Sequence, residues 1–120
     1  MHEFFKVLAD ETRLRCLAII FNYGEVCVCE LIHALELPQS KISRHLAILK
    51  LNKIIRQRRE GQWIFYAIHP ELSPFKQRII QQTIKELGHT SPFKEDTQHL
   101  ATMDCRPSLS NKAKAEKAHV

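Results

Sequence analysis

The stretch EVCVCELIHALELPQSKISRHLAILKLNK, residues 25–53, contains two segments with helical periodicity separated by a proline. Each segment has one apolar stripe: Leu31, Ala34 and Leu35 in the first, and Ile42, Leu46 and Leu49 in the second. Pro38 disfavours helical geometry at Leu37, so the first helix must end before the second begins. Two short helices joined by a tight turn are expected, and the stretch therefore predicts a helix-turn-helix.

The hydrophobic pattern changes period directly after this stretch. Residues 55–59 and 62–68 are predicted to be strands joined by a turn at Glu60 and Gly61, and Gly61 is free to adopt the positive φ of a tight hairpin turn. A hairpin attached to a helix-turn-helix is a wing, so we expect a mainly α fold with one β-hairpin, a winged helix-turn-helix. The rings of Trp63, Phe65 and Tyr66 are expected to cover the core, with a stacking platform for single-stranded nucleic acid as the alternative.

Further helical patterns flank this region. Asp10 is a candidate N-cap for a helix that Gly24 would end, and residues 25–27 then form a brief extended link. Residues 4–8 and 70–87 carry apolar stripes that nothing else in the chain explains, which favours a homodimer. We expect one domain for DNA binding and dimerisation, residues 1–88, and a polar, disordered tail, residues 89–120, that carries Cys105.

Positive charge is concentrated in a fifth of the chain. The 120 residues have a net charge of +5, whereas residues 39–62 alone carry seven basic side chains and one acidic one, a net +6. Such a concentration favours a polyanionic partner, here double-stranded DNA. The sequence shows neither a signal peptide nor a long apolar run, so we expect a cytoplasmic protein with no membrane partner.

The polar face of the second helix supplies the candidate DNA contacts. Its first turns would enter the major groove, where glutamine and arginine make bidentate contacts to base edges. The residues expected to reach the bases are Gln39, Ser40, Ser43 and Arg44. Those expected to touch phosphates are Lys41 on the helix and Arg58 and Arg59 on the wing. His45, beside the apolar stripe, is expected to be packed or to contact phosphate.

The four cysteines of the chain are Cys16, Cys27, Cys29 and Cys105. In a reducing compartment we expect thiols, metal ligands or redox sensors, and no disulfide framework. The segment CVCE, residues 27–30, has the spacing of a capping box with Cys27 at the N-cap. A side chain there folds back toward Cys29, and the free N–H groups of the helix start favour thiolates, which a thiophilic ion needs as ligands. Cys16 is expected to be a small buried hydrophobe.

Four segments together resemble the ArsR/SmtB family of metal- and metalloid-responsive repressors: LADETRLRCL (8–17), EVCVCEL (25–31), PQSKISRHLAIL (38–49) and REGQWIFYAI (59–68). The second of these is similar to the ELCVCDL metal box of arsenic and cadmium/lead sensors. The resemblance implies a homodimeric transcriptional repressor that leaves an imperfect palindromic operator when arsenite or antimonite binds Cys27 and Cys29. It implies no organic cofactor, and it assigns the dimer interface to residues 4–8 and 70–87.

The chain departs from this family at one ligand position. In the best-known arsenic sensors a third cysteine stands three residues after the second, where this chain has Ile32, followed by His33. Arsenite favours three thiolates, so either two suffice or Cys105 supplies the third, and His33 is an alternative ligand for a harder metal. Cadmium/lead sensors draw cysteines from an N-terminal arm not seen here, and IIQQTIKEL (79–87) lacks the ligand set of zinc sensors. Arsenic and antimony are therefore favoured, with cadmium or lead as the alternative.

Two other functions remain open, and a third is disfavoured. The chain could be a redox or reactive-sulfur sensor in which Cys27 or Cys29 pairs with Cys105 or Cys16. It could also be an architectural DNA-binding module without an inducer. A small thiol enzyme is disfavoured, because the sequence has no phosphate-cradling loop and no nucleophile with a basic residue beside it.

Overall fold

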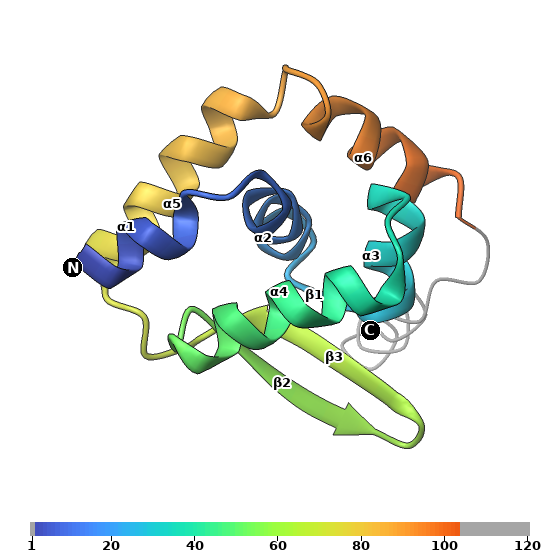
Figure 1. Cartoon of the computed structure of the whole chain (residues 1–120), viewed down its shortest axis with the longest axis horizontal. Helices are drawn as coiled ribbons and strands as arrows, with labels where there is room; N and C mark the ends of the chain where they lie inside the picture. The colour runs from blue at the N-terminus through green and yellow to red at the C-terminus, as the bar shows by residue number, and fades with distance from the viewer. Residues whose placement is uncertain (1, 104–120) are drawn as a thin grey trace, which may run out of the picture.

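The computed structural model describes residues 2–103, over which the chain forms six helices and three strands (Figure 1). In chain order these are α1 (His2–Leu8), α2 (Glu11–Tyr23), β1 (Glu25–Cys27), α3 (Val28–Leu35), α4 (Gln39–Leu51), β2 (Ile55–Glu60), β3 (Trp63–Ile68), α5 (Pro74–Leu87) and α6 (Phe93–Ala101). None of the helices in this part of the chain has the length and apolar character needed to cross a bilayer.

Helix α2 is the centre of the fold. Leu17 and Ile20 on this helix are completely buried, and the other helices lie around it (Figure 1). The predicted N-cap is confirmed, because the Asp10 carboxylate accepts a hydrogen bond of 3.1 Å from the backbone N–H of Arg13. The predicted end is also confirmed: Gly24 has φ +83°, a left-handed conformation that ends the helix without a side-chain clash.

The predicted helix-turn-helix is formed by α3 and α4. Helix α3 ends after Leu35, where Glu36 adopts the left-handed conformation with φ 55°, and Pro38 precedes the first residue of α4. The apolar stripes predicted for these helices are buried, including Leu31, Ile42 and Leu46. Local sequence signals therefore placed both helices correctly.

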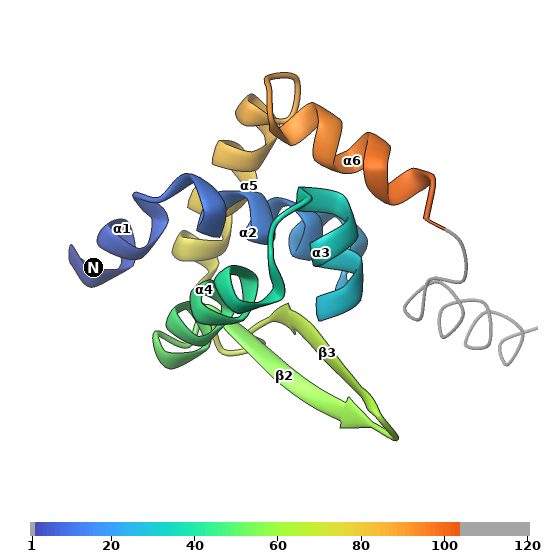
Figure 2. The same ribbon diagram turned by 45° about the vertical axis from the view of Figure 1, so that its right-hand side comes forward.

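The predicted wing is the hairpin of β2 and β3, which projects from the helical body (Figure 2). Gly61 in its turn has φ +60°, as expected. The segment predicted as an extended link is a third strand, so the antiparallel sheet has the order β1-β3-β2. Cys27 lies opposite Phe65 in this sheet, and both residues are buried. The wing strand β3 is consequently paired with the residue that caps α3.

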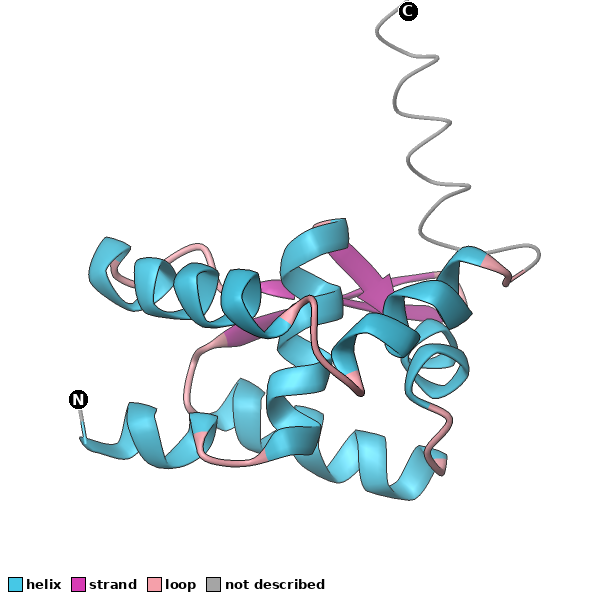
Figure 3. Cartoon of the chain, turned by 90° about the horizontal axis from the view of Figure 1, so that it is seen from above, coloured by secondary structure: helices cyan, strands magenta, loops and turns pink. Residues whose placement is uncertain are grey.

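Helices α1 and α5 lie together at one end of the molecule (Figure 1). The N-terminus lies at this end, far from the sheet's wing tip in sequence, and is marked in Figure 3. The ammonium of Lys76 on α5 sits 5.3 Å from the centre of the Phe4 ring on α1. Each helix also leaves one phenylalanine half exposed, Phe5 on α1 and Phe75 on α5, with 49% of each surface accessible. Most residues of the predicted apolar stripes, including Phe4, Val7, Ile80 and Ile84, are buried within one chain, so Phe5 and Phe75 are the large apolar side chains that these two helices leave exposed.

Helix α6 corrects the prediction of a disordered segment from residue 89 onward. Phe93 and Leu100 on this helix are buried, and α6 packs along α3 and α2. Asp96 is 2% exposed and forms a bidentate ion pair with Arg15 of α2, with oxygen to nitrogen distances of 2.7 and 2.8 Å. Two apolar anchors and this ion pair hold the helix in place. The remainder of the predicted tail, including Cys105, lies outside the described residues.

Candidate DNA interface and cysteine site

The polar face of α4 presents the residues predicted to read DNA. Gln39, Ser40, Ser43 and Arg44 are exposed on its first turns, and Lys41 is half-buried beside them. The opposite face is held in the core, which fixes how the polar face is oriented. The structure therefore brings these five predicted DNA contacts together at the N-terminal half of one exposed helix, the geometry that major-groove reading requires.

His45 is part of the packing beneath this helix. Its side chain is 8% exposed, its Nδ1 lies 3.2 Å from a guanidinium nitrogen of Arg13, and the Asp10 carboxylate is 3.8 Å away. Burial lowers the pKa of His45 below its ordinary value, while the Asp10 charge opposes that shift. The imidazole therefore links α4 to the start of α2, in keeping with the predicted packing role.

On the wing, Arg58 and Arg59 have different surroundings. Arg58 binds both oxygens of Glu25 on β1 at 2.6 and 2.8 Å, also pairs with Glu60, and lies 4.7 Å from the Phe65 ring centre. These hydrogen bonds raise the pKa of Arg58 further above its usual range. The guanidinium expected to contact phosphate is thus bound within the protein, because the sheet brings Glu25 beside it. Arg59 is exposed, and the Gly61 carbonyl accepts a hydrogen bond from it.

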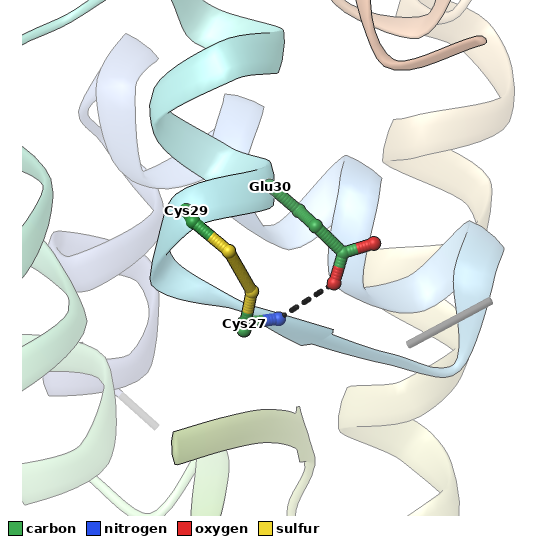
Figure 4. The surroundings of a disulfide bond; sticks show 3 residues. All are labelled: Cys27, Cys29 and Glu30. Carbon is green, nitrogen blue, oxygen red and sulfur yellow. Dashed lines mark hydrogen bonds between the residues drawn. A yellow bond between two sulfur atoms is a disulfide. The ribbon is translucent and has the colours of Figure 1, made fainter. Parts of the chain in front are cut away.

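The cysteine pair lies at the start of α3. Cys27 is the N-cap, as predicted, and its backbone N–H donates a hydrogen bond of 2.9 Å to the buried Glu30 carboxylate (Figure 4). The two Cα atoms of Cys27 and Cys29 are 5.5 Å apart and their sulfurs are joined in a disulfide. The predicted approach of the two sulfurs is confirmed, whereas the expectation of free thiols differs from this oxidised state.

A hollow of about 260 Å³ lies beside the cysteine pair. It is bounded by the cysteine segment of residues 27–32, called the box below, by the start of α4 and by the wing. The lining residues are Cys27, Val28, Cys29, Ile32, Gln39, Gln62, Trp63 and Ile64. Sequence reasoning did not connect Trp63 or Gln62 with the cysteines. The available signal was the extended segment Glu25, Val26 and Cys27, which is long enough to pair as a short strand with the wing. The cysteine pair, the start of α4 and the wing thus meet at one hollow.

Comparison with known proteins identifies the family. Residues 10–55 match the family described as "Bacterial regulatory protein, arsR family". The arsenic resistance transcriptional regulator ArsR1 of Pseudomonas putida is 45% identical over 103 residues, which span 86% of this chain and 79% of that protein. The chain belongs to the ArsR family. The resemblance predicted from the four sequence segments is thereby confirmed.

Solved structures of two other proteins have a similar fold. HlyU from Vibrio cholerae matches with a TM-score of 0.63 at 32% identity, covering 70% of this chain and 87% of that one. The AntR antimony-specific transcriptional repressor matches with a TM-score of 0.60 at 32% identity, covering 70% and 73%. The predicted winged helix-turn-helix is therefore confirmed for this ArsR-family member.

The remaining candidate ligands of this ArsR-family chain lie apart from the box. Cys16 is completely buried on α2, and burial raises the pKa of its thiol to about 12, which fits the predicted hydrophobic role. His33 is exposed on α3. Within residues 2–103, no cluster of three or more His, Cys, Asp or Glu side chains is arranged to hold a metal ion.

Proposed function

We propose that this ArsR-family member is a DNA-binding transcriptional repressor of a metalloid-resistance operon, released from its operator when arsenite or antimonite binds the thiolates of Cys27 and Cys29. One observation carries the proposal: the cysteine pair, the first residue of α4 and the wing share one hollow. The printed names of its relatives, an arsenic resistance regulator and an antimony-specific repressor, agree with it.

The dithiol form of the box is the state that binds. Reduced Cys27 and Cys29 lie at the free N–H groups of α3, which favour thiolate over thiol. Trivalent arsenic bridging the two sulfurs fixes their separation. Since Cys27 is both the last residue of β1 and the N-cap of α3, a change there shifts α3 against the wing strand. Release then requires that the metalloid bind the DNA-free arrangement better, by a typical coupling of about 1–3 kcal/mol.

Cys105 is the proposed third thiolate for inorganic arsenite. It follows the last residue of α6 by four positions, and α6 packs along α3, the helix that carries the box. Four extended residues span at most about 14 Å. The last turn of α6 lies against the C-terminal end of α3, where His99 Nδ1 is 2.9 Å from the Ala34 carbonyl oxygen. These four residues would therefore have to run back along α3, about 12 Å long, to bring Cys105 to the cysteine pair.

DNA contacts are proposed for the exposed face of α4 and for the wing. Gln39, Ser40, Ser43 and Arg44 reach base edges, and Lys41 and Arg59 contact phosphates. Arg58 would have to exchange its ion pair with Glu25 to do the same. A homodimer in the cytoplasm, joined through α1 and α5 by their half-exposed Phe5 and Phe75, would place two such faces on a palindromic operator.

The first experiment follows arsenite binding to the reduced full-length protein through the ultraviolet charge-transfer band between sulfur and arsenic. Wild type should saturate at about one arsenic per subunit, Cys27→Ser should lose the band, and Cys105→Ser should weaken it. Cys16→Ser is the matched control and should behave as wild type. Absence of a band in wild type would contradict the proposal.

The second experiment measures DNA release. An operator selected from a random DNA pool is bound by wild type and by Cys27→Ser, and arsenite is added while fluorescence anisotropy is followed. Wild type should dissociate, whereas Cys27→Ser should bind the DNA equally well and remain bound. Normal release of Cys27→Ser would show that induction does not pass through the box.

The disulfide between Cys27 and Cys29 favours one alternative, a redox-sensing repressor of the same fold. In that case, oxidation of the dithiol would release DNA without any metalloid, and a reductant would restore binding. The same anisotropy assay with an oxidant in place of arsenite separates the two functions, because only the redox sensor would release DNA without a metalloid. Cys16→Ser is the control and should leave either response intact.

A further inference from the structure

The C-terminal end of α3 is held by two side chains that lie outside the helix-turn-helix. A helix leaves its last carbonyl groups without partners of its own. In α3, the Ala34 carbonyl accepts a hydrogen bond of 2.9 Å from Nδ1 of His99 on α6, which must carry the proton because a carbonyl oxygen only accepts. The Leu35 carbonyl accepts one of 3.0 Å from Nη2 of Arg15 on α2. The end of α3 is therefore bonded to both α2 and α6.

Helix α6 contributes to both of these attachments. Asp96 on α6 accepts hydrogen bonds from Nε and Nη2 of Arg15, which fixes the guanidinium that reaches Leu35. His99 follows Asp96 on the same face of the helix, and the buried Leu100 beside it holds the last turn of α6 against the core. Helix α6 thus supplies one donor to the end of α3 and steadies the other.

The two ring nitrogens of His99 contribute unequally. Nε2 lies 3.6 Å from the Glu36 carboxylate in the turn after α3. The Glu36 side chain is 69% exposed, so water screens this contact and it contributes little. Nδ1 instead bonds the carbonyl of Ala34, a completely buried residue, where an acceptor left without a partner is costly. The bond from Nδ1 is therefore the one that holds the end of α3.

A short turn connects this point to the helix that faces DNA. Residues 36–38 alone separate the end of α3 from Gln39, the first residue of α4. The Pro38 carbonyl accepts hydrogen bonds of 3.1 Å from the N–H groups of Lys41 and Ile42, in the first turn of α4. A shift at the end of α3 therefore passes directly into the turn that carries the proposed base contacts. Such contacts need their side chains placed to within about 0.5 Å.

We propose that α6 braces the helix-turn-helix and that His99 is a positioning residue for operator recognition, acting through its Nδ1 bond to Ala34. The inference rests on the proposed function, DNA binding through α4, and assigns to it a residue on a different helix. Bidentate contacts to base edges fix direction as well as distance, whereas phosphate contacts carry no sequence information. Loss of the His99 bond should therefore weaken binding to the operator more than binding to random DNA.

The test compares His99→Asn with His99→Gln in the reduced full-length protein. The amide nitrogen of asparagine lies the same number of bonds from Cα as Nδ1 and can donate to Ala34, whereas that of glutamine corresponds to Nε2. Fluorescence anisotropy measures binding to an operator selected from a random DNA pool and to a duplex of random sequence. His99→Gln should bind the operator about fivefold more weakly and random DNA as wild type does. His99→Asn should recover most of the operator affinity.

A second measurement needs no DNA. Amide hydrogen exchange of Lys41 and Ile42, whose N–H groups bond the Pro38 carbonyl, should be roughly fivefold faster in His99→Gln. In His99→Asn it should stay close to the wild-type rate. A residue that only added global stability would change the unfolding temperature without this local effect on the first turn of α4.

The matched control is Gln98→Ala, which changes the exposed neighbour of His99 on α6 and should leave affinity and exchange unchanged. Thermal unfolding verifies that each variant is folded. Wild-type operator affinity or unchanged exchange in His99→Gln, equal losses on operator and random DNA, or a His99→Asn variant as weak as His99→Gln would overturn this inference and leave the proposed function standing. Failure of wild type to bind any selected DNA would overturn both.

Discussion

The ion pair between Asp96 and Arg15 should be the main polar attachment of α6. We therefore consider Asp96→Asn, which keeps the size and shape of the side chain and removes its charge. One oxygen of Asp96 accepts a hydrogen bond from Arg15 Nε and the other from its Nη2, at 2.8 and 2.7 Å. An amide can replace only one of these acceptors, so its NH₂ group would face an arginine N–H.

The expected cost follows from burial on both sides of the pair. Asp96 is 2% exposed and the Arg15 side chain 13%. Removing one partner of a buried ion pair typically costs about 3–5 kcal/mol, because the other charge is left without compensation. Arg15 keeps its hydrogen bond of 3.0 Å to the Leu35 carbonyl, which places the expected loss at the lower end. We expect about 3 kcal/mol of unfolding free energy, or roughly 10 °C in Tm.

The assay is urea unfolding of the reduced full-length protein, followed by far-ultraviolet circular dichroism at one fixed protein concentration. Gln98→Ala changes an exposed residue on the same helix and should alter the unfolding free energy by less than about 0.5 kcal/mol. Replacing both partners, Arg15→Met with Asp96→Leu, should recover part of the loss, since no buried charge remains. If Asp96→Asn were as stable as Gln98→Ala, the ion pair would not be what fixes α6.

Three further predictions concern α4 and the wing. Arg44→Ala should cost about 1–3 kcal/mol in specific operator binding with unchanged thermal stability, and equal loss on specific and random DNA would contradict base reading. Arg59→Ala should weaken all DNA binding and lower the salt slope by about one, whereas Arg58→Ala, whose guanidinium is paired with Glu25, should chiefly lower stability. Burial lowers the pKa of His45, so the unfolded chain binds that proton first, and stability is lost as pH falls below about 6.5. Unfolding curves of His45→Gln should show a weaker loss over that range, and an unchanged pH dependence would contradict the assignment.

Features set by neighbouring residues were predictable from the sequence. Asp10 and Cys27 act as caps through bonds that reach only three residues along the chain, so spacing alone identified both. Gly61 was likewise identifiable, since a hairpin turn of this kind requires positive φ. The helices of the DNA-reading motif followed from apolar periodicity for the same local reason.

Features set by distant residues were missed. Helix α6 depends on Asp96 meeting Arg15, 81 positions earlier, and the few apolar residues around it made the segment look unable to fold. The spacing of Phe93, Asp96 and Leu100 along one face was the signal that was available. Arg58 was assigned to phosphate because nothing local reveals Glu25, 33 positions away across the sheet.

Cys27 belongs both to β1 and to the start of α3, and it lies apart from the helix face proposed to contact DNA. Under the proposed function, residues 27–32 hold the ligand chemistry and residues 39–44 hold the base contacts. Cys27 couples the first of these segments to the wing, because it ends β1 and caps α3. Substitutions within residues 27–32 could therefore change which inducer binds, while the recognised operator sequence stays the same. In evolution and in biosensor design, the ligand-binding segment could thus be replaced without changing the DNA-binding helix.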